Sequence, residues 1–183
     1  PVSKTESMTV YGDTKGAKEE YNYTNNLLET LTKYDQNNVA WIKEKYTYDE
    51  GNSIGFGNIT KKEISNSSDS QIITTKSQYE GKGRFVEKTT DNLGLETLIT
   101  YNDWGQVKTQ TDPLNNTVSN IYDNWGKLQS STSNLEGITS YQYEKFNESG
   151  ISGTKITQIS PGGNIKVSFT NSLGQNYKNA TKA

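Results

Sequence analysis

The sequence of 183 residues contains no cysteine and no histidine. The absence of cysteine excludes disulfides and thiol chemistry. The absence of both residues removes the usual nucleophile–base pairs and the metal clusters built from thiolates and imidazoles. We therefore expect no enzyme activity, no cofactor and no metal, while the missing cysteines leave the compartment open. No apolar run approaches the ~18 residues of a membrane-spanning helix, so we expect no membrane span.

Core-forming residues are also scarce. Leu, Ile, Val and Phe together number 34 of 183, a level that indicates disorder when net charge is high as well. The net charge is only −2, from 19 basic and 21 acidic residues, and this balance predicts no nucleic-acid partner. Tyr (12) and Thr (23) are abundant, and both favour strands. We expect strands with much polar surface on at least one face.

What the sequence does contain is a unit that recurs every 21 or 22 residues. Each unit opens on a Tyr, reaches a Gly a few residues later and ends on a Leu after a polar turn. In such arrays each copy is one supersecondary unit that stacks on the next. The residues that carry the pattern, and to which we assign a structural role, are Tyr79, Gly83, Tyr101, Asp103, Trp104, Gly105, Asp112, Pro113, Tyr122, Asp123, Trp125, Gly126 and Tyr143.

This pattern resembles the YD (tyrosine–aspartate) repeat of RHS-repeat proteins. The resemblance is carried by Tyr122-Asp123-Asn124-Trp125-Gly126-Lys127-Leu128 and by Thr111-Asp112-Pro113-Leu114. It covers roughly residues 40–175 and is best from Tyr79 to Tyr143. The sequence departs from the pattern where Asn102 precedes the Asp of its unit, where Glu80 follows Tyr79, and where Ser133 replaces an Asp.

The resemblance implies an all-β fold in which antiparallel hairpins stack into an extended, curved sheet. Similar repeats build hollow shells that enclose a C-terminal toxin in bacterial systems, and a similar shell forms part of the teneurin adhesion proteins of animals. About six units are too few to close a shell. The resemblance thus implies a wall segment of a bacterial secreted or cell-surface protein, whose partners are neighbouring repeats of the same parent chain and the enclosed toxin. The start at Pro1, without a visible signal peptide, suggests a processed or excised piece.

We divide the sequence into four regions: irregular N-terminal strands and a linker (1–38), degenerate repeats (39–78), regular repeats (79–143) and degenerate repeats again (144–183). Period-two alternation predicts a strand over 39–48. Residues 21–34 favour two strands around Asn25-Asn26, although Leu27, Leu28 and Leu31 also have helical spacing. The other expected elements are a short strand and a Gly-Lys-Glu linker within 1–20, a turn at 49–52, a loop at 53–57, strands at 58–65 and 71–79 around a loop at 66–70, and a hairpin of 106–111 and 117–122.

Repeat position suggests roles for individual side chains. We expect Asp103, Asp112 and Asp123 to accept backbone N–H groups and so hold their turns. The tyrosines of successive units are expected to pack ring on ring as a ladder, and Trp104 and Trp125 to form a second such pair.

The alternative function is a carbohydrate- or cell-binding adhesion module, with Trp41, Trp104 and Trp125 stacking on sugar rings. We favour packing of these indoles between repeats over exposure. An enzyme would need a carboxylate pair such as Asp103 with Asp123, and the repeat explains both residues more simply. Asp49-Glu50 and Asp123-Asn124 offer oxygen ligands for calcium, but without the spacing of a calcium loop.

Overall fold

The computed structural model describes residues 3–10, 17–50, 55–66 and 68–182. These residues form strands and turns, without a helix among them, which confirms the predicted all-β class. They divide into two units, Pro1–Thr97 and Leu98–Ala183, and the border between the units falls inside one strand. The described residues accordingly contain no helix of the length and apolarity that crossing a bilayer requires.

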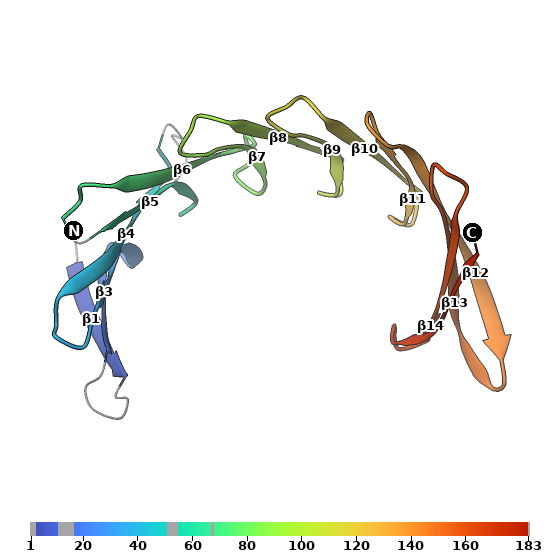
Figure 1. The fold of residues 1–183 in the computed structure, drawn as a ribbon, viewed down its shortest axis with the longest axis horizontal. Helices are drawn as coiled ribbons and strands as arrows, with labels where there is room; N and C mark the ends of the chain where they lie inside the picture. The colour runs from blue at the N-terminus through green and yellow to red at the C-terminus, as the bar shows by residue number, and fades with distance from the viewer. Residues whose placement is uncertain (1–2, 11–16, 51–54, 67, 183) are drawn as a thin grey trace. The chain divides into compact units, whose positions relative to one another are not determined.

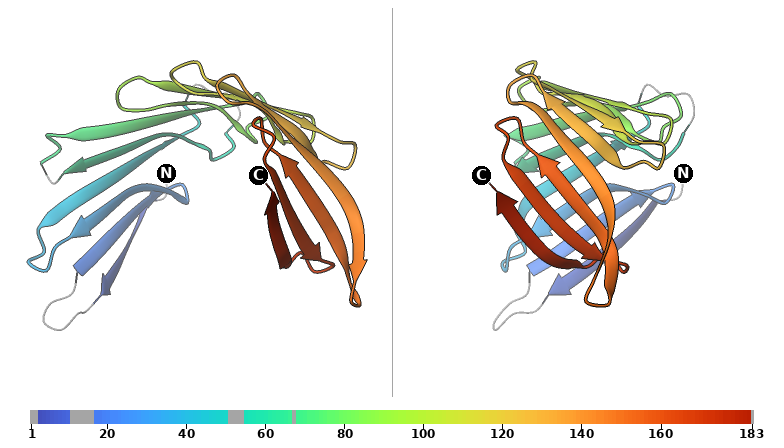
Figure 2. Two further views of the ribbon diagram at one scale, coloured as in Figure 1. Left: turned by 45° about the vertical axis from the view of Figure 1, so that its right-hand side comes forward. Right: turned by 90° about the vertical axis from the view of Figure 1, so that its right-hand side faces the viewer.

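The first unit is an antiparallel sheet whose strands pair in sequence order (Figure 1). Short turns join these strands, so each strand lies beside its sequence neighbour in the views of Figure 2 as well. The strands are β1 (Ser3–Val10), β2 (Ala17–Thr24), β3 (Leu27–Tyr34), β4 (Ala40–Tyr48), β5 (Ile59–Asn66), β6 (Ile72–Tyr79) and β7 (Val86–Thr90), and β8 (Glu96–Tyr101) begins here.

The second unit has the same antiparallel, sequential order. Its strands are short at first and longer from β12 on, where the hairpin of β12 and β13 extends beyond Tyr143. The strands after β8 are β9 (Val107–Thr111), β10 (Thr117–Tyr122), β11 (Leu128–Ser133), β12 (Gly137–Glu148), β13 (Ile151–Ile159), β14 (Ile165–Asn171) and β15 (Asn176–Lys182).

Local sequence explains the strands around the first described hairpin. Asn25 and Asn26 adopt φ of 51° and 64°, which Asn tolerates and which a two-residue hairpin turn requires. This confirms the two predicted strands, so the helical alternative for 27–31 is wrong. The prediction of a Gly-Lys-Glu linker within residues 1–20 is also wrong for residues 17–20, because β2 already begins at Ala17. The turn expected at 49–52 and the loop at 53–57 fall partly on 51–54, outside the described residues.

A register shift recurs beside tyrosines at or next to the ends of strands. The shift lies immediately before Tyr23, Tyr34, Tyr48, Tyr79, Tyr101 and Tyr122. An extra residue on one strand raises the local twist and re-aims the neighbouring side chains. The repeat therefore corresponds to one bulged hairpin.

The described parts of these sheets contain no buried apolar core. Among the described residues no hydrophobic side chain is buried, and the one buried polar residue is Ser65 at 9% exposure. Both faces carry half-buried and exposed side chains. Backbone pairing and contacts along the sheet edges must therefore hold the strands in place.

Candidate functional site

The repeat places the same five-residue turn after many of the strands. The backbone N–H of its first residue donates to the carbonyl oxygen of its fifth residue. The N–H of its fourth residue donates to the carbonyl oxygen of its first residue. The side-chain oxygen of the first residue accepts the N–H groups of the third and fifth residues. The six turns with all of these bonds begin at Asp35, Asp91, Asn102, Asp112, Asp123 and Asn171.

The predicted turn-holding role is confirmed for two of the three aspartates. Asp123 Oδ1 accepts from Trp125 and Lys127 at 2.9 and 2.8 Å. Asp112 accepts in the same way, and hydrogen bonds from the side chain and backbone of Asn116 hold its pKa below the ordinary value. The prediction for Asp103 is wrong, because Asn102 directly follows the strand and its amide oxygen accepts these bonds.

The fourth turn residue needs a left-handed backbone. Gly105 and Gly126 adopt φ of 80° and 77°, a region that costs other L-residues energy. Asn115 takes this place in the turn after β9 with φ of 64°. Pro113 precedes it at the second turn position, where the lost N–H donor is not needed.

The recurring tyrosines join successive hairpins through their hydroxyl groups. Tyr122 donates to the Val107 carbonyl at 2.9 Å, and Tyr143 donates to the Leu128 carbonyl at 3.0 Å. In the first unit Tyr79 reaches Ile59 at 3.3 Å, although this bond is long. For Tyr122 and Tyr143 the connection is therefore a hydroxyl–backbone bond, and the ring-on-ring ladder expected there is wrong.

Neighbouring turns on one sheet edge are also latched together. In the second unit the Gln106 side chain donates to the Gly126 carbonyl at 2.7 Å. The indole of Trp104 lies over the same glycine, since a methyl group there would sit 3.6 Å from two ring carbons. The first unit repeats the arrangement: Asn58 donates to the Gly83 carbonyl at 2.6 Å, and the Phe56 ring covers that glycine. We call this pair of contacts the turn latch.

The tryptophans are exposed, which corrects the expectation that they pack between repeats. Trp104 is 68% exposed, Trp125 is 85% exposed and Trp41 is 66% exposed. Trp104 contacts the next turn rather than the next indole, so the predicted Trp pair is not formed as a ring stack. Trp125 has no latch because β12 runs on for five residues past Tyr143, beyond the level where a following turn would lie.

A groove of about 410 Å³ opens beside Trp104. Asp103, Lys108 and Asn124 line it, and their side chains make no hydrogen bond or ion pair with the described part of the chain. Asp123 also lines the groove, but one of its carboxylate oxygens is committed to its turn. The groove thus combines a fixed aromatic surface with an uncommitted carboxylate, ammonium and amide.

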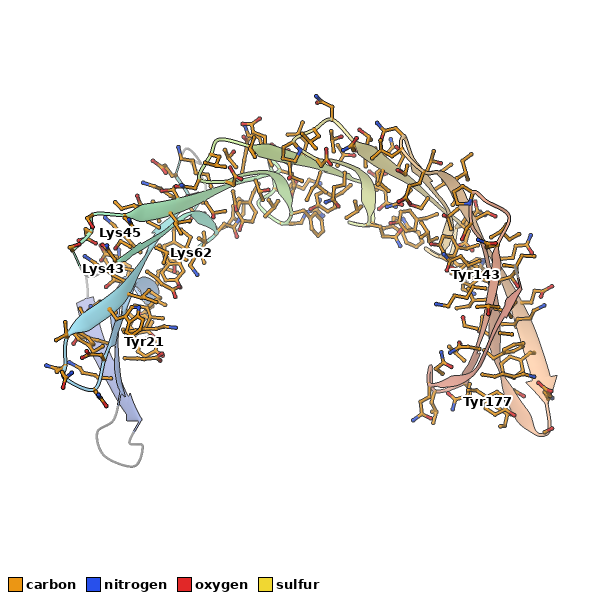
Figure 3. All side chains as sticks on the ribbon, viewed as in Figure 1. Tyr21, Lys43, Lys45, Lys62, Tyr143 and Tyr177 are labelled. Atoms are coloured by element: carbon orange, nitrogen blue, oxygen red, sulfur yellow. The ribbon has the colours of Figure 1, made fainter. Side chains whose placement is uncertain are left out.

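The first unit holds a charged cluster on one face of its sheet. Glu44 accepts from Tyr46 at 2.6 Å and from Lys62 at 2.7 Å, and Lys33 lies 4.0 Å away. Burial raises the pKa of Glu44, but these bonds outweigh it and the net pKa is lowered. Burial and then the Glu44 bond raise the pKa of Tyr46 to about 12. Figure 3 shows Lys62 and Tyr21 on this face, opposite Lys43 and Lys45.

Both aspartates considered for calcium, Asp49 and Asp123, accept backbone N–H groups. Asp49 accepts the N–H groups of Gly57 and Asn58 at 2.8 and 3.1 Å, so it closes its own loop. Within the described ranges no three or more acidic residues cluster in a way that could hold a metal ion.

No protein-family model matches the sequence, and no curated protein matches it. The turn latch was not foreseen from the sequence. A signal for it was present, because Phe56-Gly57-Asn58 and Trp104-Gly105-Gln106 share the order aromatic, Gly, amide.

Proposed function

We propose that this chain is a structural segment of an RHS-repeat β-shell that encloses a C-terminal toxin or effector in a bacterial secreted protein. The observation that carries the proposal is an ordered repeat sheet without a buried apolar residue among those described. Such a sheet gains its stability from neighbours along the array rather than from a private core. Further repeats of the parent chain would continue the pattern of turn latches and tyrosine hydroxyl bonds at both ends.

The wall function also fits the chemistry of the sheet faces. Charges occur in compensated groups such as Glu44 with Lys62 and Lys33, and hydroxyl pairs such as Thr100 with Thr109 and Thr111 with Thr117 cross neighbouring strands. Paired charges and hydroxyl groups of this kind can face an enclosed chain without leaving polar groups unpaired. In this role Asp112 and Asp123 hold their turns and take no part in a reaction.

Small-angle X-ray scattering of the chain, extrapolated to zero concentration, tests the wall function. A compact globule of this length has a radius of gyration of about 16 Å. An open wall segment without a core gives a clearly larger radius and a profile of a curved plate. A radius near the compact value, with Trp fluorescence that iodide does not quench, would show units folded around a private core and would overturn the proposal.

A second candidate function, a carbohydrate-binding adhesion module, is favoured by one observation: Trp104 and Trp125 are exposed at the same turn position of successive hairpins. The two functions are compatible, since a shell wall has an outer surface. They are separable by experiment, because sugar binding and sheet shape are measured independently.

A further inference from the structure

The third residue of the five-residue turn is apolar in five of its six occurrences and points away from the sheet. These side chains are among the most exposed apolar residues of the described chain: Leu93 80%, Trp104 68%, Leu114 80%, Trp125 85% and Leu173 80%. The two tryptophans occupy this position on the same sheet edge, because both turns join an even-numbered strand to the next odd-numbered one. At this edge the second unit therefore presents two exposed indoles at equivalent positions of consecutive hairpins.

We propose that this edge of the second unit binds a linear polysaccharide, with one sugar ring stacked on Trp104 and another on Trp125. The inference rests on the second candidate function and names its site and its ligand class. Two strand spacings separate equivalent positions of consecutive hairpins, which is about 10 Å. That distance matches the length of a disaccharide in an extended glycan, so alternate sugars of one chain meet the two indoles.

The neighbouring turn holds the Trp104 indole, the first of these two stacking surfaces, in place. One side of the Trp104 ring lies over Gly126, and the Gln106 amide holds that glycine carbonyl at 2.7 Å. The residue nevertheless remains 68% exposed. A ring that already rests on a neighbouring turn loses less conformational entropy when a ligand stacks on it than a ring without such a contact. Sugars present apolar C–H faces that suit such an aromatic surface.

Polar groups beside this stacking surface give the site hydrogen-bonding capacity. Asp103, Lys108 and Asn124 line the same groove and are uncommitted within the described chain. Together they offer acceptors and donors, the combination that sugar hydroxyl groups require. The arrangement favours a chain of hydroxyl-rich sugars over a purely apolar ligand, which would leave these three groups unpaired.

The test measures binding of oligosaccharides to the 183-residue chain by isothermal titration calorimetry, with the indole N–H signals followed by NMR. The probes are di-, tetra- and hexasaccharides of four linear glycans: cello-, chito-, malto- and hyaluronan oligosaccharides. We expect at least one series to bind, with the hexasaccharide at least tenfold tighter than the disaccharide, because only the longer chain reaches both indoles.

The variants W104A and W125A should each weaken hexasaccharide binding about tenfold, which corresponds to about 1.4 kcal/mol. W41A is the matched control, because Trp41 is similarly exposed at 66% but lies near the start of β4 rather than at this edge. Circular dichroism verifies the fold of each variant, and W104F, which keeps a smaller ring over Gly126, should retain part of the affinity.

Three results would overturn the proposal: no binding by any series, affinity independent of glycan length, or an equal loss in W41A. Each of them leaves the scattering result on the wall segment unchanged. Conversely, a compact scattering profile with intact binding would reject the wall function and keep the glycan site.

Discussion

The two units use one turn but hold their strands by different means. In the first unit, strands of eight or nine residues carry the Glu44 cluster, and the Phe56 ring is pressed on Gly83. In the second unit, strands β8 to β11 have five or six residues, and its ion pairs, such as Lys155 with Glu144, are exposed. The shared turn sets the repeat, while the side chains on the sheet face differ between the two units. The following predictions compare the two units, beginning with the largest expected effect.

Gly83→Ala should be the most damaging single change, at about 3 kcal/mol of unfolding free energy. Alanine at φ of 68° costs about 1–2 kcal/mol, and its methyl group would collide with the Phe56 ring, which adds about 1–3 kcal/mol. Gly94→Ala is the control, with a similar φ of 79° and no atom within 4 Å. Urea denaturation measures both, and Gly83→Ala in a Phe56→Ala background should cost no more than the control change.

Gly126→Ala extends the same comparison to the second unit. Its methyl group would lie 3.2 Å from the Gln106 amide and 3.6 Å from Trp104. The loss of unfolding free energy should therefore stay near the cost of placing alanine at a positive φ, about 1–2 kcal/mol. An effect as large as that of Gly83→Ala would show that the two latches are equally tight.

Glu44→Gln should destabilise the chain by about 2 kcal/mol, because a hydrogen-bonded charge at 14% side-chain exposure is lost beside Lys62. Glu144→Gln in the second unit removes the negative charge that pairs with Lys155, at 57% exposure, and should cost less than about 0.5 kcal/mol. Equal values from urea denaturation would mean that the cluster contributes no more than a surface ion pair.

Asp123→Ala should cost about 1–2 kcal/mol, since two backbone N–H groups lose their acceptor. Asp103→Ala, at the second position of the preceding turn, should change stability by no more than about 0.5 kcal/mol. Comparing the two variants distinguishes an aspartate that accepts the turn's N–H groups from an aspartate that lies in the motif without accepting them. If Asp103→Ala proved the more damaging variant, the assignment of Asn102 as turn acceptor would fail.

Tyr122→Phe should cost about 1 kcal/mol, because it deletes the 2.9 Å bond to the Val107 carbonyl and keeps the ring. Tyr177→Phe is a fitting control, as its hydroxyl has no hydrogen-bond partner in the described chain and the residue is 43% exposed. Thermal unfolding would distinguish them by a shift of a few degrees. Equal melting temperatures would assign the stabilisation to the ring alone.

Acidification should weaken the first unit before the second. Lowered carboxyl pKa values occur at Glu44, Asp49, Asp69 and Glu80 in the first unit, and at Asp112 in the second. A folded-state pKa below the unfolded value of about 4 stabilises the fold above that pH and loses this effect as pH falls through the folded pKa. Amide hydrogen exchange at pH 5 and pH 3 should show earlier loss of protection in β4–β6 than in β9–β11, by a small margin because these groups are largely exposed. Uniform loss would contradict this.

The sequence predicted the strands within 21–48 and the hairpin of 106–111 and 117–122 because their causes are local. Alternation in 39–48, the tolerance of Asn25-Asn26 for positive φ and the Tyr-to-Gly spacing all act within a few residues. The assignment of Asp103 failed because the motif was aligned on Asp, whereas the turn selects the residue directly after the strand, here Asn102. The exposure of Trp104 and Trp125 depends on how neighbouring hairpins meet, for example on the greater length of β12. The local sequence pattern does not determine these contacts between hairpins.

The turn latch has a direction. Phe56 and Trp104 each rest on a glycine that lies further along the chain, at Gly83 and Gly126. During synthesis from the N-terminus, each of these two rings therefore stays uncovered until about one more hairpin has left the ribosome. The last ring of the regular series, Trp125, keeps that uncovered state in the finished unit.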